Sequence, residues 1–403
     1  MTMLASSSSH AAGRPWSSHA SIPTTRTRMV GPDILRSLAI LLVMLVHLPL
    51  NATPAALVTV REYGWLGVDI FFVLSGYLIG TQLFKEIARM GTVDFKAFYL
   101  RRAFRIFPAF FVVLGFYAFI PLLRDAPTMQ PLWKFATFTV NLGFDPRQGN
   151  AFSQAWTLAV EEQFYLALPL LVLLFHRRIG TRWVLALAGL LTVAGIVLRY
   201  TLWDTQVGAL VAGGQFRPAF ATYLRDIYYP TYTRLDGLLF GVVLAAARFF
   251  RPDFCGRWLP ARVTLPLGLA FVIAALICFA IRGPLEGTGM FPVFQAQLGA
   301  VAGFPLISIG IALVFCAMLD LEHVLKRWPV PGAALVATLS YSLYLTHKSV
   351  FHIMRLLVGE EYLQGGIGFF IYLTTSFAIA ALLWLCVERT ALHLRDRLLS
   401  PSR

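Results

Sequence analysis

The chain has 403 residues, of which 58% are hydrophobic and 13% are charged. Ordinary soluble domains carry about 25% charged residues, so this composition argues against a string of soluble domains. The net charge of +14 is typical of some nucleic-acid-binding proteins, but the basic residues here lie between apolar runs, where they orient a membrane protein. We therefore expect the lipid bilayer as a partner and no nucleic acid.

In chain order, residues 1–29 come first and are rich in Ser, Thr, Ala and Arg. They contain no apolar core, which excludes a secretory signal and predicts a disordered cytoplasmic tail. A membrane domain is predicted over 30–390, and 391–403 form a second cytoplasmic tail. Apolar runs of about 20 residues are long enough to cross a bilayer as helices. The predicted spans are 33–50, 65–84, 104–123, 157–175, 183–202, 230–248, 263–281, 299–319, 334–357 and 367–387.

The distribution of lysine and arginine orients these helices. The even-numbered connections and the residues after the last span are basic, whereas the ninth connection carries Glu360 and Glu361. Positive residues stay on the cytoplasmic side. This alternation requires that the short apolar piece at 131–143 does not cross. We predict an all-α integral membrane protein, a bundle of about ten transmembrane helices with both termini cytoplasmic. In this prediction 131–143 is a re-entrant or interfacial segment on the outer side, and the protein is a multi-pass protein of the cell inner (plasma) membrane.

The first predicted helix carries two ionisable side chains, Arg36 near one end and His47 near the other. Eleven steps of about 100° bring the two onto one face of the helix. At about 1.5 Å per residue they lie roughly 16 Å apart along the axis. An ionisable residue inside a membrane helix is costly and by default marks a functional site. For His47 alone, a hydrogen-bonded interfacial histidine is the simpler alternative.

Five predicted helices bring ionisable side chains to a similar depth in the outer half of the bilayer. Membrane charges normally face the bundle interior and pair there, so we expect one site. Asp69 also suits a structural role at a helix start, and His347 also suits a packing role. The set comprises His47, Asp69, Glu161, Glu162, Arg234, Asp236, Tyr344 and His347.

On the inner side Arg36 shares its predicted depth with Arg102 and Arg105, which lie three residues apart on one helix face. Positive-inside charge explains most basic residues here. Arginines also hold phosphates through bidentate hydrogen bonds, and a histidine acts as a general base near neutral pH, with a carboxylate to orient it. A donor with a phosphate-rich head and a long reactive arm suits this arrangement. Coenzyme A has that shape, and the geometry does not single it out.

The chain resembles the membrane-bound acyltransferase 3 family in seven short motifs that occur in the family's order. Each motif is weak alone, but together they cover nearly the whole chain except 1–29 and the outer loops. Thr157 and Ala159 stand where serines are expected, and Lys348 follows His347, which bears on the acceptor site. The motifs are Asp33-Ile-Leu-Arg36 with ten residues before His47, GVDIFFVLSG at 67–76, RAFR at 102–105, WTLAVEEQFY at 156–165, RLDG at 234–237, SYSLYLTH at 340–347, and Glu388-Arg389.

The resemblance implies transfer of an acyl group, usually acetyl, from cytoplasmic acyl-coenzyme A to a hydroxyl group. It implies that His47 is the catalytic base. The family's acidic pair matches Glu161 and Glu162, of which adjacent helix positions let one face the site. Its basic motifs, with a role in donor binding, match Arg36, Arg102 and Arg105.

We expect acyl-coenzyme A, most simply acetyl-coenzyme A, as co-substrate, and no metal. The expected acceptor is a glycan or lipid-linked saccharide of the cell envelope. A small-molecule acceptor such as a macrolide is an alternative, and a proton-coupled transporter is an alternative of another class. The sequence leaves the acceptor, acyl chain length and oligomeric state open, as well as the choice between direct transfer and an acyl-histidine intermediate.

Two further predictions concern residues near helix ends and contacts. Trp65, Trp156 and Trp203 lie at predicted outer boundaries, which is typical of aromatic anchors at the membrane interface. Ser75 precedes Gly76 without the elbow motif of a serine nucleophile. We expect these small residues to mark a close contact between helices.

Overall fold

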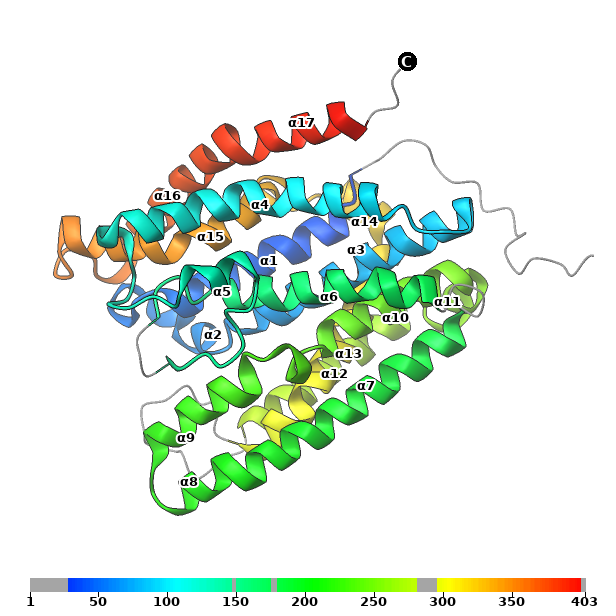
Figure 1. The fold of residues 1–403 in the computed structure, drawn as a ribbon, viewed down its shortest axis with the longest axis horizontal. Helices are drawn as coiled ribbons and strands as arrows, with labels where there is room; N and C mark the ends of the chain where they lie inside the picture. The colour runs from blue at the N-terminus through cyan, green and yellow to red at the C-terminus, as the bar shows by residue number, and fades with distance from the viewer. Residues whose placement is uncertain (1–27, 147–149, 175–179, 281–295, 400–403) are drawn as a thin grey trace, which may run out of the picture.

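The computed structural model describes residues 28–146, 150–174, 180–280 and 296–399. Within these ranges the protein is all-helical, with turns and an isolated β-bridge between Thr128 and Asn150. The predicted tail at 1–29 lies almost wholly outside the described residues. Figure 1 shows the helices running roughly along the long axis of the molecule, as in a membrane bundle.

Each predicted span overlaps one long helix. Eight helical stretches in the described residues are long and apolar enough to cross a membrane; α10, with 15 residues, and α15 are outside that set. The number of crossings and the side of the termini therefore stay predictions. The long helices are α1 (Val30–His47), α3 (Leu66–Met90), α4 (Phe95–Phe119), α6 (Ala155–Leu174), α7 (Thr181–Leu202), α10 (Asp236–Phe250), α12 (Ala261–Ala280), α13 (Phe304–Asp320), α15 (Ala333–Val358) and α16 (Gly365–Leu383).

Short helical segments connect or extend the long helices. Among them α17 continues α16 through one turn, so residues 391–399 are helical (Figure 1). They are η1 (Leu50–Ala52), η2 (Ala55–Leu57), α2 (Val58–Glu62), η3 (Pro121–Leu123), α5 (Leu132–Ala136), η5 (Trp203–Val207), α8 (Gly208–Ala212), α9 (Phe216–Tyr223), η6 (Leu224–Tyr228), η7 (Thr231–Thr233), α11 (Pro252–Trp258), η9 (Gly299–Gly303), α14 (Glu322–Arg327), η10 (Trp384–Glu388) and α17 (Arg389–Leu399).

The segment 131–143 forms the short helix α5 followed by turns. Phe135 and Val140 are buried, and the Asn141 amide donates hydrogen bonds to the Tyr229 carbonyl and the Thr231 hydroxyl, at 3.2 and 2.8 Å. A five-residue helix is far too short to cross a bilayer. The segment thus folds back on the bundle, and its position relative to the membrane stays a prediction.

Local signals set the boundary between α3 and α4. Gly91 follows α3 with φ of 71°, a left-handed conformation that glycine adopts without steric cost. The Asp94 carboxylate then accepts a hydrogen bond from the Ala97 amide at 2.9 Å and caps the start of α4. These two residues turn the chain back toward the core after the first pair of long helices.

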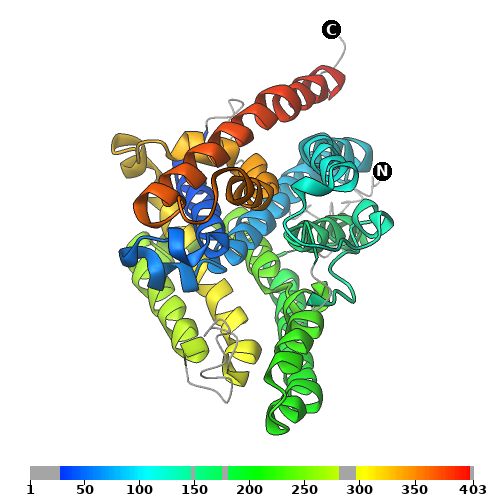
Figure 2. The same ribbon diagram turned by 90° about the vertical axis from the view of Figure 1, so that its left-hand side faces the viewer.

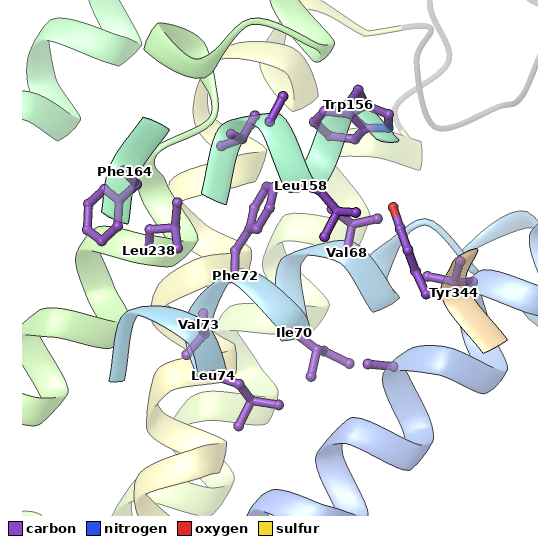
Figure 3. Close-up of a cluster of buried hydrophobic side chains, with 14 of the residues drawn as sticks. Val68, Ile70, Phe72, Val73, Leu74, Trp156, Leu158, Phe164, Leu238 and Tyr344 are labelled. Carbon is purple, nitrogen blue, oxygen red and sulfur yellow. The ribbon is translucent and has the colours of Figure 1, made fainter. Parts of the chain in front are cut away.

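The centre of the bundle is built from α1, α3, α10 and α15. α3 packs on α10 through glycines: a Cβ added at Gly76 would lie 2.1 Å from the Leu238 carbonyl oxygen, and one at Gly241 would lie 2.2 Å from that of Val73. Such contacts let helix backbones approach closely in a membrane. The expected small-residue contact is confirmed at Gly76. Figure 3 shows the apolar side chains of α3, including Phe72, packed among those of α6 and α10.

Two groups of helices extend from this centre. In Figure 2, α7 to α9 form one group and the α12–α13 pair forms another, while α17 packs against α4.

The three tryptophans expected at the membrane interface are buried in the protein: Trp65, Trp156 and Trp203 are only 4%, 6% and 6% exposed. That prediction is wrong, because these tryptophans pack against other segments of the protein. Trp65, for example, contacts the rings of Phe279 and Phe304.

Candidate functional site

Two histidines meet where α1 ends. The His47 Nδ1 atom lies 2.8 Å from the Val43 carbonyl oxygen and 3.2 Å from His347 Nε2. The His347 Nδ1 atom lies 3.0 Å from the Leu343 carbonyl oxygen and 2.9 Å from that of Tyr344. His347 is fully buried, whereas His47 is exposed. The pair therefore combines one buried ring with one ring on an exposed residue.

An ion pair lies next to the histidines. Lys348 Nζ is 2.5 Å from an Asp125 carboxylate oxygen and donates to the Ser153 hydroxyl at 2.6 Å. Burial by itself raises the pKa of Asp125, but the charge and hydrogen bond of Lys348 outweigh it and hold that pKa below its usual value of 3.8. The pair ties α15 to the loop after α4. Lys348 thus has a structural partner.

A cavity of about 140 Å³ lies between α1, α3, α4, α6 and α15. It is lined by all three arginines that the family resemblance assigns to donor binding. Glu161 also lines the cavity, whereas Glu162 does not. The residues lining it are Arg36, Val68, Phe71, Phe72, Leu74, Ser75, Leu78, Arg102, Arg105, Ile106, Thr157, Leu158, Glu161, Tyr165, Ser340, Tyr341 and Tyr344.

Glu161 is held at the wall of this cavity. The Ser75 hydroxyl donates to its carboxylate at 2.5 Å. The Arg102 guanidinium stacks 3.8 Å over the Tyr165 ring, one turn further along α6. Of the adjacent carboxylates Glu161 faces the cavity, while the buried Oε1 of Glu162 has no hydrogen-bond partner among the described residues. Ser75 thus contributes to the cavity, in addition to the helix contact made by its neighbour Gly76.

The other two arginines have carboxylate partners. Arg105 Nη1 lies 2.6 Å from Glu388, whose second oxygen accepts from the Ser342 hydroxyl at 3.0 Å. Arg36 Nη1 lies 3.5 Å from Asp33. The closing Glu388 motif therefore positions an arginine of the cavity. Arg102 differs, since its buried Nε atom has no hydrogen-bond partner in the described part of the chain.

Tyr344 lies between the cavity and the histidines. It lines the cavity, and its hydroxyl donates to the Gln154 carbonyl oxygen at 2.9 Å and lies 2.5 Å from the Thr157 hydroxyl. Its ring centroid is 6.1 Å from that of His347, one turn further along α15. Neither His47 nor His347 lines the cavity, and Tyr344 is the lining residue next to the histidine pair. In the described residues no Asp or Glu hydrogen-bonds to the His47 ring.

Three other predicted site residues form a separate buried cluster. Arg234 Nη2 lies 3.1 and 3.2 Å from the two oxygens of Asp69, and Arg199 Nη1 lies 2.8 Å from Asp236. All four side chains are at most 5% exposed, and none lines the cavity. The Arg234 guanidinium also lies 3.7 Å over the Phe304 ring. These pairs join α3, α7 and α10.

Sequence reasoning missed several of these residues. Arg199 is an arginine inside an apolar run, which by itself signals a buried partner. Tyr165 follows Glu161 by four positions and so shares its helix face, a spacing visible in the sequence. Asp125 gave no signal, because it lies in a loop whose contact with Lys348 depends on the packing of distant segments.

The known proteins that this chain resembles in sequence are described as acyltransferases. Residues 29–385 match the family described as an acyltransferase domain, the acyltransferase 3 family. The relatives include "Putative O-acetyltransferase SAS0844" of Staphylococcus aureus strain MSSA476, 27% identical over 362 residues, and "O-acetyltransferase OatA" of strain NCTC 8325, 26% identical over 364 residues. Both alignments cover 85% of this chain and 53% of the relative, so the chain spans about half the length of these relatives. No solved structure matches the chain.

Proposed function

We propose that this chain, which belongs to the acyltransferase 3 family, is a membrane O-acyltransferase. It would move an acyl group from acyl-coenzyme A to a hydroxyl group of a cell-surface or lipid-linked glycan. The relatives are named as O-acetyltransferases, which favours acetyl as the group. The observation that carries the proposal is the arginine-lined cavity, whose lining includes Tyr344, a neighbour of the paired histidines.

The donor would bind through the three arginines. The unpartnered Nε of Arg102 is a buried cationic donor, and a phosphate oxygen would satisfy it. Arg36 and Arg105 line the same cavity and are each paired with a carboxylate that fixes the side chain. A cavity of about 140 Å³ is too small for the whole of coenzyme A, so we propose that it takes the narrow arm and the adjoining phosphates beside the arginines, while the rest of the head stays outside.

The chemistry would proceed at His47. Its Nε2 atom removes the proton from the acceptor hydroxyl, and the oxygen forms a bond to the thioester carbonyl carbon. The carbon–sulfur bond then breaks, and the departing coenzyme A thiolate takes the proton from the imidazolium. A transient acyl-histidine is the covalent variant of this route. Glu161, which faces the cavity, acts on the donor side in this proposal, and Glu162 has a supporting role behind it.

The proposed orientation follows from charge. Ten helices would cross the inner membrane with both termini in the cytoplasm, because the basic connections alternate with less basic ones. The arginine cavity then opens toward the cytoplasmic half and receives acyl-coenzyme A there. His47 lies in the outer half, exposed to an envelope glycan.

Release of coenzyme A from acetyl-coenzyme A tests this function. Purified wild-type protein, His47→Ala and the control His393→Ala are compared, each with and without an extract of cell-envelope glycans. His393 is an exposed histidine on α17, away from the cavity. We expect release that requires both the extract and His47 and that survives in the control. Turnover in His47→Ala equal to that of wild type, in protein that folds and inserts normally, would refute the role of His47.

A further inference from the structure

We propose that His347 is a positioning residue that takes the place of the carboxylate in a catalytic triad. It holds the Nδ1–H group of His47 and leaves His47 Nε2 as the unprotonated nitrogen that faces the acceptor. The proposal rests on the proposed acyl transfer, in which His47 is the base. It names the group that orients that base, for which sequence reasoning expected an aspartate or glutamate.

The proton position on His347 follows from its neighbours. Its Nδ1 atom lies within hydrogen-bond distance of two backbone carbonyl oxygens, those of Leu343 and Tyr344. A carbonyl oxygen only accepts, so Nδ1 of His347 must carry a hydrogen. The ring is fully buried, and a neutral imidazole avoids the cost of burying a charge. In the neutral ring Nε2 is then an acceptor with a free lone pair.

The same reasoning then fixes His47. Its Nδ1 atom faces two acceptors, the Val43 carbonyl oxygen at 2.8 Å and the His347 Nε2 lone pair at 3.2 Å. An unprotonated Nδ1 would be repelled by both, so Nδ1 carries the hydrogen and donates it to the two acceptors. In neutral His47 the remaining nitrogen, Nε2, is bare and available to take a proton.

Two acceptors on different helices give the ring one orientation. Val43 lies on the same helix as His47 and moves with it, whereas His347 lies on α15. A rotation of the His47 ring that kept one contact would lose the other. His347 is itself held by two carbonyls and by the rings of Tyr344 and Phe351. The base is therefore aligned before substrate binds, as the aspartate of a triad aligns its histidine.

Among the described residues, the charged side chains near the histidine pair are engaged elsewhere and do not orient the His47 ring in place of His347. Lys348 is paired with Asp125, and Arg61 donates to the Leu48 carbonyl oxygen at 2.9 Å. When His47 takes the hydroxyl proton, its Nδ1–H remains donated to Val43 and His347. The charge resides on His47 until the coenzyme A thiolate removes the proton, so His347 gains and loses no proton.

The test is ring nitrogen NMR on protein labelled with ¹⁵N-histidine, because ¹⁵N shifts distinguish the two neutral tautomers. The chain has eight histidines, and His47→Ala identifies the signal of interest. Wild type is compared with His347→Gln, whose amide reaches as far as Nε2, and with His347→Asn, which is too short. We expect the Nδ1–H tautomer of His47 in wild type and His347→Gln, and a mixture in His347→Asn.

Turnover is measured on the same samples. We expect kcat to fall roughly 10-fold to 100-fold in His347→Asn, as for loss of an orienting partner elsewhere, and to recover largely in His347→Gln. The KM for acetyl-coenzyme A should stay unchanged, since the arginines are untouched. An Nε2–H tautomer in wild-type His47, or a wild-type tautomer and turnover in His347→Asn, would overturn the proposal. The NMR result needs no turnover, so it separates failure of this inference from failure of the proposed function.

Discussion

Replacing Asp69 with alanine is predicted to destabilise the protein strongly while leaving the chemistry of the folded fraction intact. Asp69 and Arg234 are 3% and 1% exposed, and both carboxylate oxygens face the same guanidinium nitrogen. Removing one partner of a buried ion pair leaves an uncompensated charge and typically costs about 3–5 kcal/mol. Within the described residues Arg234 forms no other salt bridge, although its contact with the Phe304 ring persists in the variant.

The size of the effect follows from what remains around the guanidinium. A desolvated cation–π contact is worth about 2 kcal/mol and stays in place, so we expect the lower part of that range, about 3 kcal/mol. Arg234→Met should cost less, because an unpaired Asp69 can take up a proton and become neutral. The double variant, which buries neither charge, should be more stable than Asp69→Ala alone.

Thermal unfolding of the purified protein in detergent, followed by tryptophan fluorescence, measures these changes. We expect Asp69→Ala to melt at least about 5 °C below wild type. The control is Asp396→Asn, which removes the exposed carboxylate of the Arg395–Asp396 pair and should leave the melting temperature within about 1 °C of wild type. A melting temperature of Asp69→Ala equal to that of wild type would refute the argument that this pair is a buried structural element.

Two more predictions concern stability. Gly241→Ala should destabilise the protein by about 1–3 kcal/mol, because its Cβ would lie 2.2 Å from the Val73 carbonyl oxygen. The control Gly115→Ala, whose Cβ would have nothing within 4 Å, should not destabilise it. Equal melting temperatures of the two variants would contradict the close α3–α10 contact. Asp125→Asn should lower the melting temperature at pH 7. The pKa of Asp125 is lowered by Lys348, so its carboxylate stabilises the fold above pH 3.8 and that contribution is lost as the pH falls through the lowered pKa. The gap between variant and wild type should therefore close below pH 3.8, and a gap that widens there would contradict the pairing.

The helices and the inner arginines were predictable from local sequence. Apolar run lengths place one long helix in each predicted span, and the spacing of Arg102 and Arg105 places both at the cavity that also receives Arg36. These predictions depend on helix length and on helix periodicity, which the sequence carries directly.

The partners of the polar residues that were predicted to lie in the outer half of the bilayer were not predictable in the same way. Depth along the membrane grouped His47 with Asp69, Arg234 and Asp236, but depth says nothing about the direction in which a side chain points around its helix. In the structure Asp69 and Asp236 pair with arginines in a cluster that lies away from the cavity. Among the described residues of the predicted set, only His347 hydrogen-bonds to the His47 ring. Helix rotation and crossing, set by contacts such as Gly76 on α10, decide these pairings.

In the proposed mechanism the arginine cavity binds the donor and His47 performs the transfer. One experiment measures coenzyme A affinity and acetyl transfer in the same preparations of wild type, Arg102→Ala, His47→Ala and the control Arg262→Ala, an exposed arginine outside the cavity. Loss of a charged hydrogen bond is worth about 1.5–3 kcal/mol, so Arg102→Ala should weaken coenzyme A binding roughly 10-fold to 100-fold. His47→Ala should bind coenzyme A like wild type and transfer nothing. Wild-type affinity in Arg102→Ala, or lost affinity in His47→Ala, would contradict the claim.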